Sequence, residues 1–155
     1  YDLVIASSTE DIFQVEDDFA EYGAMIIPVE ANLATFDGVE RFYSVIKDQE
    51  RPLDSLVINA GVTLGGDFTR TSLKREIEMI NLNVISSVHL TKRVLKDMYR
   101  QGEGKILFTS SISALLPGPY EAVYSASKAF LSSFAEAIRS EARDRGVSVT
   151  ILMPG

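Results

Sequence analysis

The chain has 155 residues, enough for one domain with a sizeable buried core, and its 46% hydrophobic and 24% charged residues are typical of a globular protein. A net charge of −7 with dispersed basic residues argues against binding to nucleic acid or to an anionic membrane surface. The absence of cysteine excludes disulfides, thiol nucleophiles and thiolate metal sites, and it is compatible with the cytoplasmic location that we expect.

Strand-like and helix-like patterns alternate along the chain. Short apolar runs predict strands at residues 1–6, 24–29, 55–59, 105–109 and 147–152. Apolar residues at helical spacing predict helices at residues 12–22, 36–49, 72–100 and 121–145. Continuously apolar strands that alternate with helices favour an α/β fold, in which one parallel sheet is covered by helices on both faces. We therefore expect a single domain over residues 1–155.

Small or polar residues follow each predicted strand. Right-handed crossovers bring the carboxyl ends of parallel strands to one edge of the sheet, which is where open α/β sheets bind ligands. Any one of these residues is also an ordinary turn residue. Together they predict a ligand site formed by Ser7-Ser8, Asn32, Asn59-Ala60-Gly61, Ser111 and Pro154-Gly155.

The helix that follows Ser111 carries Tyr124 and Lys128, four residues apart and therefore on one helix face. A free phenol titrates near pH 10, and a fixed ammonium nearby favours its phenolate form. The hydroxyl of Ser111 could hold a substrate oxygen that gains or loses a proton. The spacing alone also fits a half-buried ring beside a solvated amine. Asn83 is a poor helix former inside a predicted helix, which indicates either exposure or a specific role.

These motifs, in this order, resemble those of the short-chain dehydrogenase/reductase family over nearly the whole chain. The matching segments are Asn59-Ala60-Gly61, Leu82-Asn83-Val84, Ser110-Ser111, Tyr124 to Lys128 and Pro154-Gly155. The resemblance implies a Rossmann-like doubly wound parallel sheet that contains the second to sixth strands of the family. It also implies an NAD(P)-dependent oxidoreductase that interconverts an alcohol and a carbonyl.

The resemblance assigns roles to four catalytic residues. Tyr124 would donate or accept the proton, and Lys128 would assist it and bind the nicotinamide ribose. Ser111 would position the substrate oxygen, and Asn83 would hold a water in a relay that starts at Lys128. The implied cofactor-binding residues are Ser7, Ser8, Asn32, Leu33, Asn59, Ala60, Gly61, Tyr124, Lys128, Pro154 and Gly155.

The sequence departs from the family pattern at three places. Asn32 stands where an aspartate usually contacts the adenine. Hydroxyl residues 7–9 stand where a charged residue usually selects the cofactor, and because hydroxyls can bond a 2′-phosphate we favour NADP over NAD. The Gly-rich phosphate turn with the first strand, and the substrate loop with the last strand, do not occur in this sequence. We therefore expect an excerpt of a longer protein, whose first strand would lie between the second and fourth family strands.

Two other functions remain open at this point. One is a nucleotide-sugar epimerase or dehydratase, which uses a similar Tyr/Lys pair, and the other is a non-catalytic protein that senses the cofactor. The presence of Ser111, Tyr124 and Lys128 together favours catalysis on a small-molecule alcohol or carbonyl. The resemblance also implies a homodimer or homotetramer formed through helices 72–100 and 121–145.

Overall fold

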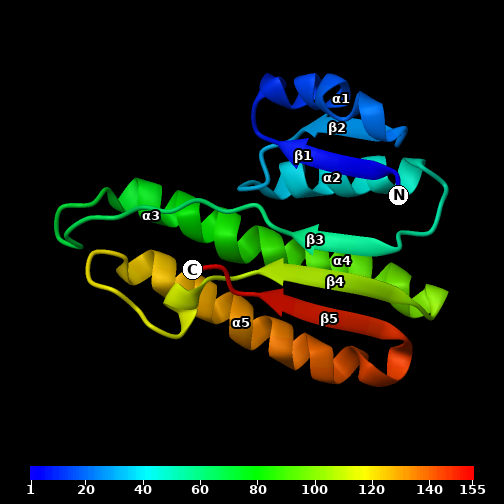
Figure 1. Cartoon of the computed structure of the whole chain (residues 1–155). Helices are drawn as coiled ribbons and strands as arrows, with labels where there is room; N and C mark the ends of the chain where they lie inside the picture. The colour runs from blue at the N-terminus through cyan, green and yellow to red at the C-terminus, as the bar shows by residue number, and fades with distance from the viewer.

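The computed structural model describes the backbone of residues 1–155 and every side chain except that of Ala20. It confirms the predicted alternation of strands and helices (Figure 1). The strands are β1 Leu3–Ser7, β2 Ile26–Glu30, β3 Ser55–Ile58, β4 Gly104–Thr109 and β5 Val147–Leu152. The α-helices are α1 Val15–Asp18, α2 Phe36–Asp48, α3 Leu73–Ile80, α4 Ser86–Gln101 and α5 Ala122–Ala142.

The segment between β1 and β2 differs from the prediction of one helix over residues 12–22. It contains a 3₁₀ turn at Glu10–Gln14, the four-residue α1, and a second 3₁₀ turn at Ala20–Tyr22. Neither Glu10–Gln14 nor α1 buries a side chain. Because an isolated helix of this length gains most of its stability from packing, the segment forms short turns and no continuous helix.

The predicted helix over residues 72–100 is one long helical segment with a π-turn in its middle. The π-turn covers Asn81–Ile85 and joins α3 to α4. Two hydroxyls bond main-chain carbonyls of this turn: Ser86 Oγ donates to the carbonyl of Leu82, and Ser87 Oγ donates to that of Asn83 at 2.9 Å. A π-turn inside an α-helix is rare and is often found at functional sites.

All described strand pairs are parallel, and the carboxyl ends of the five strands point to the same side of the molecule (Figure 1). The strands form two ladders, β1-β2 and β3-β4-β5. A cavity of about 460 Å³ lies between β1 and β3. This gap is where the family resemblance puts an additional strand.

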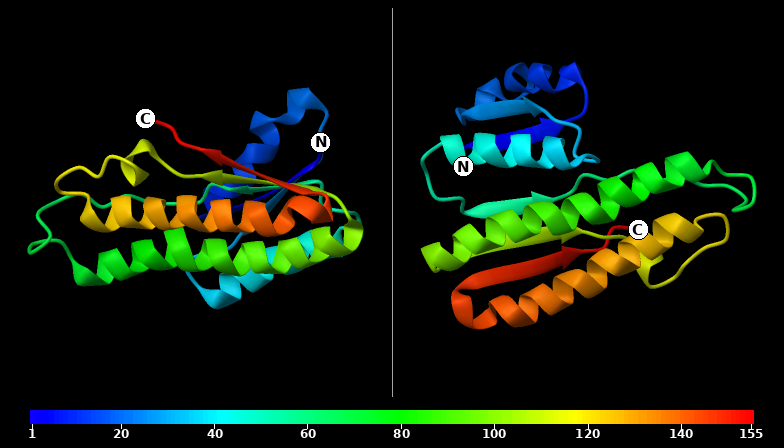
Figure 2. Two further views of the ribbon diagram at one scale, coloured as in Figure 1. Left: turned by 90° about the horizontal axis from the view of Figure 1, so that it is seen from below. Right: turned by 180° about the vertical axis from the view of Figure 1, so that it is seen from behind.

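Helices lie on both sides of the strands, but unevenly (Figure 2). Helices α2, α3–α4 and α5 cover one face, whereas the short turns of residues 10–22 lie on the other side over β1 and β2. The outer face of β3-β4-β5 is exposed in consequence. In β5, Val147 and Val149 are buried, while the alternate residues Ser148 and Thr150 are exposed.

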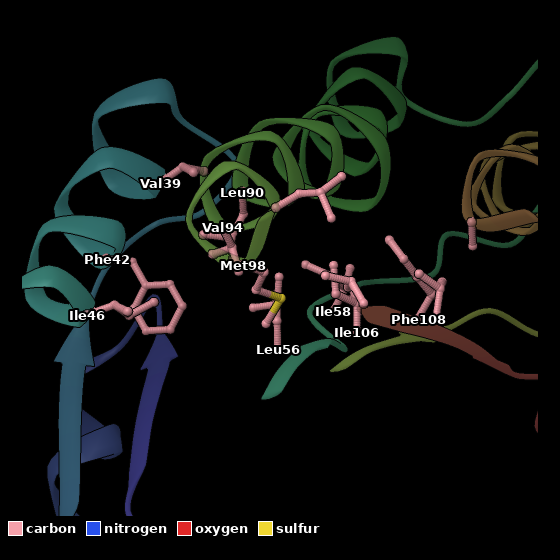
Figure 3. Close-up of a cluster of buried hydrophobic side chains, with 14 of the residues drawn as sticks. Val39, Phe42, Ile46, Leu56, Ile58, Leu90, Val94, Met98, Ile106 and Phe108 are labelled. Carbon is pink, nitrogen blue, oxygen red and sulfur yellow. The ribbon is translucent and has the colours of Figure 1, made fainter. Parts of the chain in front are cut away.

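The hydrophobic core lies between the helical layer and the strands (Figure 3). Helix α2 begins at the cap residue Thr35, whose side-chain oxygen accepts a 3.1 Å hydrogen bond from the Gly38 amide. Apolar side chains of α2 face those of α4, and side chains of β3 and β4 complete the same cluster. The labelled core residues are Val39, Phe42, Ile46, Leu56, Ile58, Leu90, Val94, Met98, Ile106 and Phe108. This packing fixes α4, and with it the π-turn, over the sheet.

Candidate active site

Tyr124 and Lys128 lie in the first two turns of α5, beside the carboxyl ends of the strands. Lys128 is buried, and its Nζ donates a 2.9 Å hydrogen bond to the carbonyl of Thr109, the last residue of β4. The same Nζ lies 5.8 Å from the centre of the Tyr124 ring. The predicted pairing of the two side chains on one helix face is thus present in the structure.

Burial of the amine lowers the pKa of Lys128, because the charged form loses hydration. Among the described side chains, no carboxylate lies within salt-bridge distance of Nζ. A buried ammonium without a paired carboxylate exerts its field on its neighbours in a medium of low dielectric. The phenol ring of Tyr124 is the aromatic group beside this ammonium.

Asn83 is completely buried in the π-turn, and its amide bonds two other segments. Its Nδ2 donates to the carbonyl of Val62 at 2.9 Å and to Ser127 Oγ at 3.1 Å. Its Oδ1 accepts from the Val62 amide at 3.0 Å. Both amide N–H groups are therefore used within the chain, and one lone pair of Oδ1 remains. This pairing explains an asparagine inside a helix, where its propensity is poor.

Gly61 lies against both Asn83 and Lys128. A Cβ atom at this position would come within 3.2 Å of Asn83 Oδ1 and 3.5 Å of Lys128 Nζ. The residue is exposed, so its backbone borders the site without a side chain covering the amine. The family resemblance assigns Gly61 to the adenosine side of the cofactor, whereas the structure brings it next to the lysine.

The two serines after β4 have different surroundings. Ser110 Oγ bonds the carbonyl of Lys128 at 3.0 Å and the hydroxyl of Ser132 at 2.7 Å, which ties the strand end to α5. Ser111 caps the 3₁₀ turn that follows, and its Oγ accepts a 3.2 Å bond from the Ser113 amide. In the described part of the chain, no hydrogen bond joins the hydroxyls of Ser111 and Tyr124. The hydroxyl proton of Ser111 remains available as a donor.

The predicted cofactor residues divide between the two ladders. Leu33, Asn59 and Ala60 line the cavity between β1 and β3, so the structure brings these three together. The hydroxyl of Ser7 accepts a weak 3.4 Å bond from the Thr9 amide, and Ser8 is exposed after β1.

Asn32 and Pro154 also lie at strand ends. Asn32 is exposed after β2, and its Oδ1 accepts a 3.0 Å bond from the Ala34 amide, which leaves its NH₂ group available. The carbonyl of Pro154 accepts a 3.0 Å bond from the Ile112 amide. That bond sets Pro154, with Gly155 after it, beside the turn capped by Ser111.

Sequence reasoning missed the role of Ser127. Sequence analysis assigns it no role, yet it is buried and bonds both Asn83 and the carbonyl of Tyr124. Its position three residues after Tyr124 is a signal that could have identified it, because residues three apart share a helix face. The contacts of Val62 and Thr109 run through main-chain atoms, so their residue types carry no such signal.

The described residues contain neither a metal-binding cluster nor a helix that could span a membrane. No cluster of three or more His, Asp or Glu side chains there could hold a metal ion. None of the helices in this part of the chain is long and apolar enough to cross a membrane.

Comparison with known proteins gives consistent results. The family described as short chain dehydrogenase matches residues 2–155. A 3-oxoacyl-[acyl-carrier-protein] reductase of Synechocystis is 34% identical over 133 residues, which cover 86% of this chain and 54% of the relative. A structure of a putative NAD(P)-dependent gluconate 5-dehydrogenase from Beutenbergia cavernae with bound NADP is 29% identical, with a TM-score of 0.89 over 99% of this chain and 61% of that one.

L-sorbose reductase of Gluconobacter frateurii, in complex with NADPH and L-sorbose, shares the fold. Its TM-score is 0.92 at 24% sequence identity, and the match covers 99% of this chain and 59% of the reductase chain. The present chain spans about half the length of the curated relatives that it matches. With the family match over residues 2–155, these similarities show that the chain belongs to the short-chain dehydrogenase/reductase family of oxidoreductases.

Proposed function

We propose that this chain carries the proton-transfer part of an NADP-dependent oxidoreductase that interconverts an alcohol and a carbonyl. The observation that carries the proposal is the buried ammonium of Lys128, which lies 5.8 Å from the Tyr124 ring and has no carboxylate partner among the described residues. A cation beside the phenol suits Tyr124 for acid/base work on a substrate oxygen.

The bound nicotinamide would supply or accept the hydride. In the reducing direction Tyr124 donates its hydroxyl proton to the carbonyl oxygen as the carbonyl carbon gains the hydride. In the oxidising direction the phenolate removes the proton from the alcohol as the hydride leaves the same carbon. Ser111 donates its hydroxyl proton to the substrate oxygen and so holds it beside Tyr124.

The residues at the sheet edge fit a dinucleotide in part. The ammonium of Lys128 has one hydrogen-bond acceptor among the described residues, the Thr109 carbonyl, so two of its three N–H groups are available to ribose hydroxyls. Leu33 follows the end of β2, and Asn59 and Ala60 follow the end of β3, so all three lie at the same edge of the strands. Ser7 and Ser8 offer hydroxyls to a 2′-phosphate, which supports NADP over NAD. We assign no described residue to the pyrophosphate.

The side chain of Asn83 contributes to this reaction through its buried contacts. Its two N–H groups are bonded to Val62 and Ser127, so the lone pair left on Oδ1 is the group with which the side chain could hold a water of the predicted relay. We therefore propose a mainly positioning role for the amide.

The proposed function is tested with the full-length protein and a panel of aliphatic, aromatic, sugar-derived and thioester carbonyls. NADPH and NADH are compared as reductants at equal concentration, and the oxidation of the nucleotide is followed by absorbance. The proposal predicts turnover of at least one carbonyl with a lower KM for NADPH than for NADH. Absence of turnover across the panel in both directions, by a protein that binds the nucleotide, favours a cofactor-sensing function.

We also propose that the protein pairs with a second copy through α3–α4 and α5. Ile77, Ile80 and Ile85 are exposed along α3 and the π-turn, and Phe130 is exposed on the neighbouring α5. Phe130→Glu should dissociate the oligomer in sedimentation experiments, whereas Ser44→Glu on α2 should not. Equal sedimentation of the Phe130→Glu variant and the wild type would contradict the proposal.

A further inference from the structure

Three segments that are distant in sequence are joined through the Asn83 amide and the buried hydroxyl of Ser127. The Ser127 side chain is 3% exposed, and its Oγ accepts a 3.1 Å hydrogen bond from Nδ2 of Asn83 in the π-turn. The same Oγ donates at 2.7 Å to the carbonyl of Tyr124, one turn earlier in α5. Asn83 in turn bonds both the amide and the carbonyl of Val62, in the loop after β3.

These hydrogen bonds join the first two turns of α5 to the π-turn. The bonded carbonyl is that of Tyr124, whose hydroxyl would transfer the proton. Lys128 is the residue directly after Ser127. A shift of the first turn of α5 would therefore move both side chains relative to the strand end at Thr109. A separate bond, from Ser110 Oγ to the carbonyl of Lys128, ties α5 to the end of β4.

We propose that Ser127 is a positioning residue for the reaction. Its hydroxyl transmits the position of Asn83 and the π-turn to Tyr124 and Lys128. This inference rests on the proposed function for its effect on turnover, whereas the bonds that it invokes do not depend on which substrate is used. Because displacement of a reacting group by about 1 Å can cost about a hundredfold in rate, a hydroxyl that touches no substrate can control turnover.

The test uses Ser127→Ala in the full-length protein, with Ser140→Ala as the matched control. Ser140 lies on the same helix and also donates its hydroxyl to a main-chain carbonyl, that of Glu136 at 3.1 Å, but it is exposed and bonds no other segment. Both variants remove one hydroxyl from α5. Only the first removes a link between α5 and the π-turn.

We expect the kcat of Ser127→Ala to fall by about tenfold to a hundredfold, with the KM for NADPH unchanged. Ser127→Thr, which retains the hydroxyl, should recover most of the rate. A wild-type kcat in Ser127→Ala, or an equal loss in Ser140→Ala, would overturn the inference.

Amide hydrogen exchange gives a second readout that needs no turnover. Peptides that cover residues 122–128 should exchange faster in Ser127→Ala than in the wild type, while peptides from α2 should not change. Unchanged exchange over residues 122–128 overturns the inference whatever the activity. If the wild type itself turns over no carbonyl, the proposed function fails, and the exchange of residues 122–128 still decides whether Ser127 holds the start of α5.

Discussion

The buried ammonium of Lys128 donates a 2.9 Å hydrogen bond to the carbonyl oxygen of Thr109, and this bond joins α5 to the last residue of β4. One main-chain acceptor compensates only part of the hydration that the ammonium loses on burial. Burial of Lys128 therefore lowers folding stability, and in the proposed function the same position sets the ammonium beside Tyr124.

Lys128→Met should abolish turnover and leave the protein at least as stable as the wild type at neutral pH. Burying an ion costs several kcal/mol, whereas the charge-assisted hydrogen bond that is lost contributes about 1.5–3 kcal/mol. Burial lowers the pKa of Lys128 in the folded state below its ordinary value of 10.5, so the unfolded chain binds more protons between the two values.

Wild-type stability should consequently rise with pH in that window, and the advantage of Lys128→Met should shrink. Denaturant unfolding of both proteins from neutral pH upward measures the difference. A Lys128→Met variant that is clearly less stable than the wild type at neutral pH would show that the contacts of the ammonium outweigh its desolvation.

Gly61→Ala should reduce turnover by about tenfold or more, because displaced reacting groups lose much of their rate. The added Cβ would lie 3.2 Å from Asn83 Oδ1, so the buried amide must shift by a few tenths of an ångström, whereas the 3.5 Å to Lys128 Nζ is an ordinary contact. Gly118→Ala is the control, since a Cβ there meets no atom within 4 Å. Steady-state kinetics on the full-length variants would compare them, and equal rates for Gly61→Ala and the wild type would contradict the close packing inferred here.

Glu40 should contribute to stability in a pH-dependent way. Its carboxylate accepts bonds from Arg93 Nε at 2.8 Å and from the terminal Arg93 nitrogen at 2.9 Å, and it also bonds His89. The hydrogen bonds from Arg93 lower the pKa of Glu40, and the bond to His89 lowers it further, whereas burial acts in the opposite direction. The stabilisation is therefore present above the ordinary carboxyl pKa and is lost as the pH falls through the lower folded value.

Glu40→Gln should therefore be less stable than the wild type at neutral pH, and the gap should close in acid. Glu136→Gln is the control, because its partner Arg139 lies on the same helix and both side chains are 53% exposed. Thermal unfolding followed by circular dichroism would measure both gaps. A stability difference between Glu40→Gln and the wild type that stays constant down to acid pH would argue against the ion pair.

Much of the fold could be predicted from the sequence. The apolar runs and the glycine stops predict all five strands and the three long helical segments, because each pattern repeats over many residues. The prediction of one helix over residues 12–22 was wrong. The apolar residues of this segment recur at helical spacing, but neither the 3₁₀ turn nor α1 buries a side chain. Periodicity alone cannot show whether a surface exists for a helix to pack against.

The site was predictable where side-chain chemistry follows a spacing. Tyr124 and Lys128 share a helix face, and Asn83 is unusual enough in a helix interior to indicate a role. The contacts that hold these residues were not predictable, because Val62 and Thr109 take part through main-chain atoms and Ser127 through a hydroxyl that is common on helices. The π-turn depends on the same tertiary bonds and has no local pattern.

The measurement that tests the central claim most directly is the turnover of Tyr124→Phe in the full-length protein, beside its binding of NADPH. This change removes one hydroxyl and keeps the ring beside Lys128. If Tyr124 transfers the proton, kcat should fall to the background rate, while the NADPH dissociation constant measured by fluorescence stays within about twofold of the wild type, a difference of about 0.4 kcal/mol. A Tyr124→Phe variant that retains wild-type turnover would contradict the account.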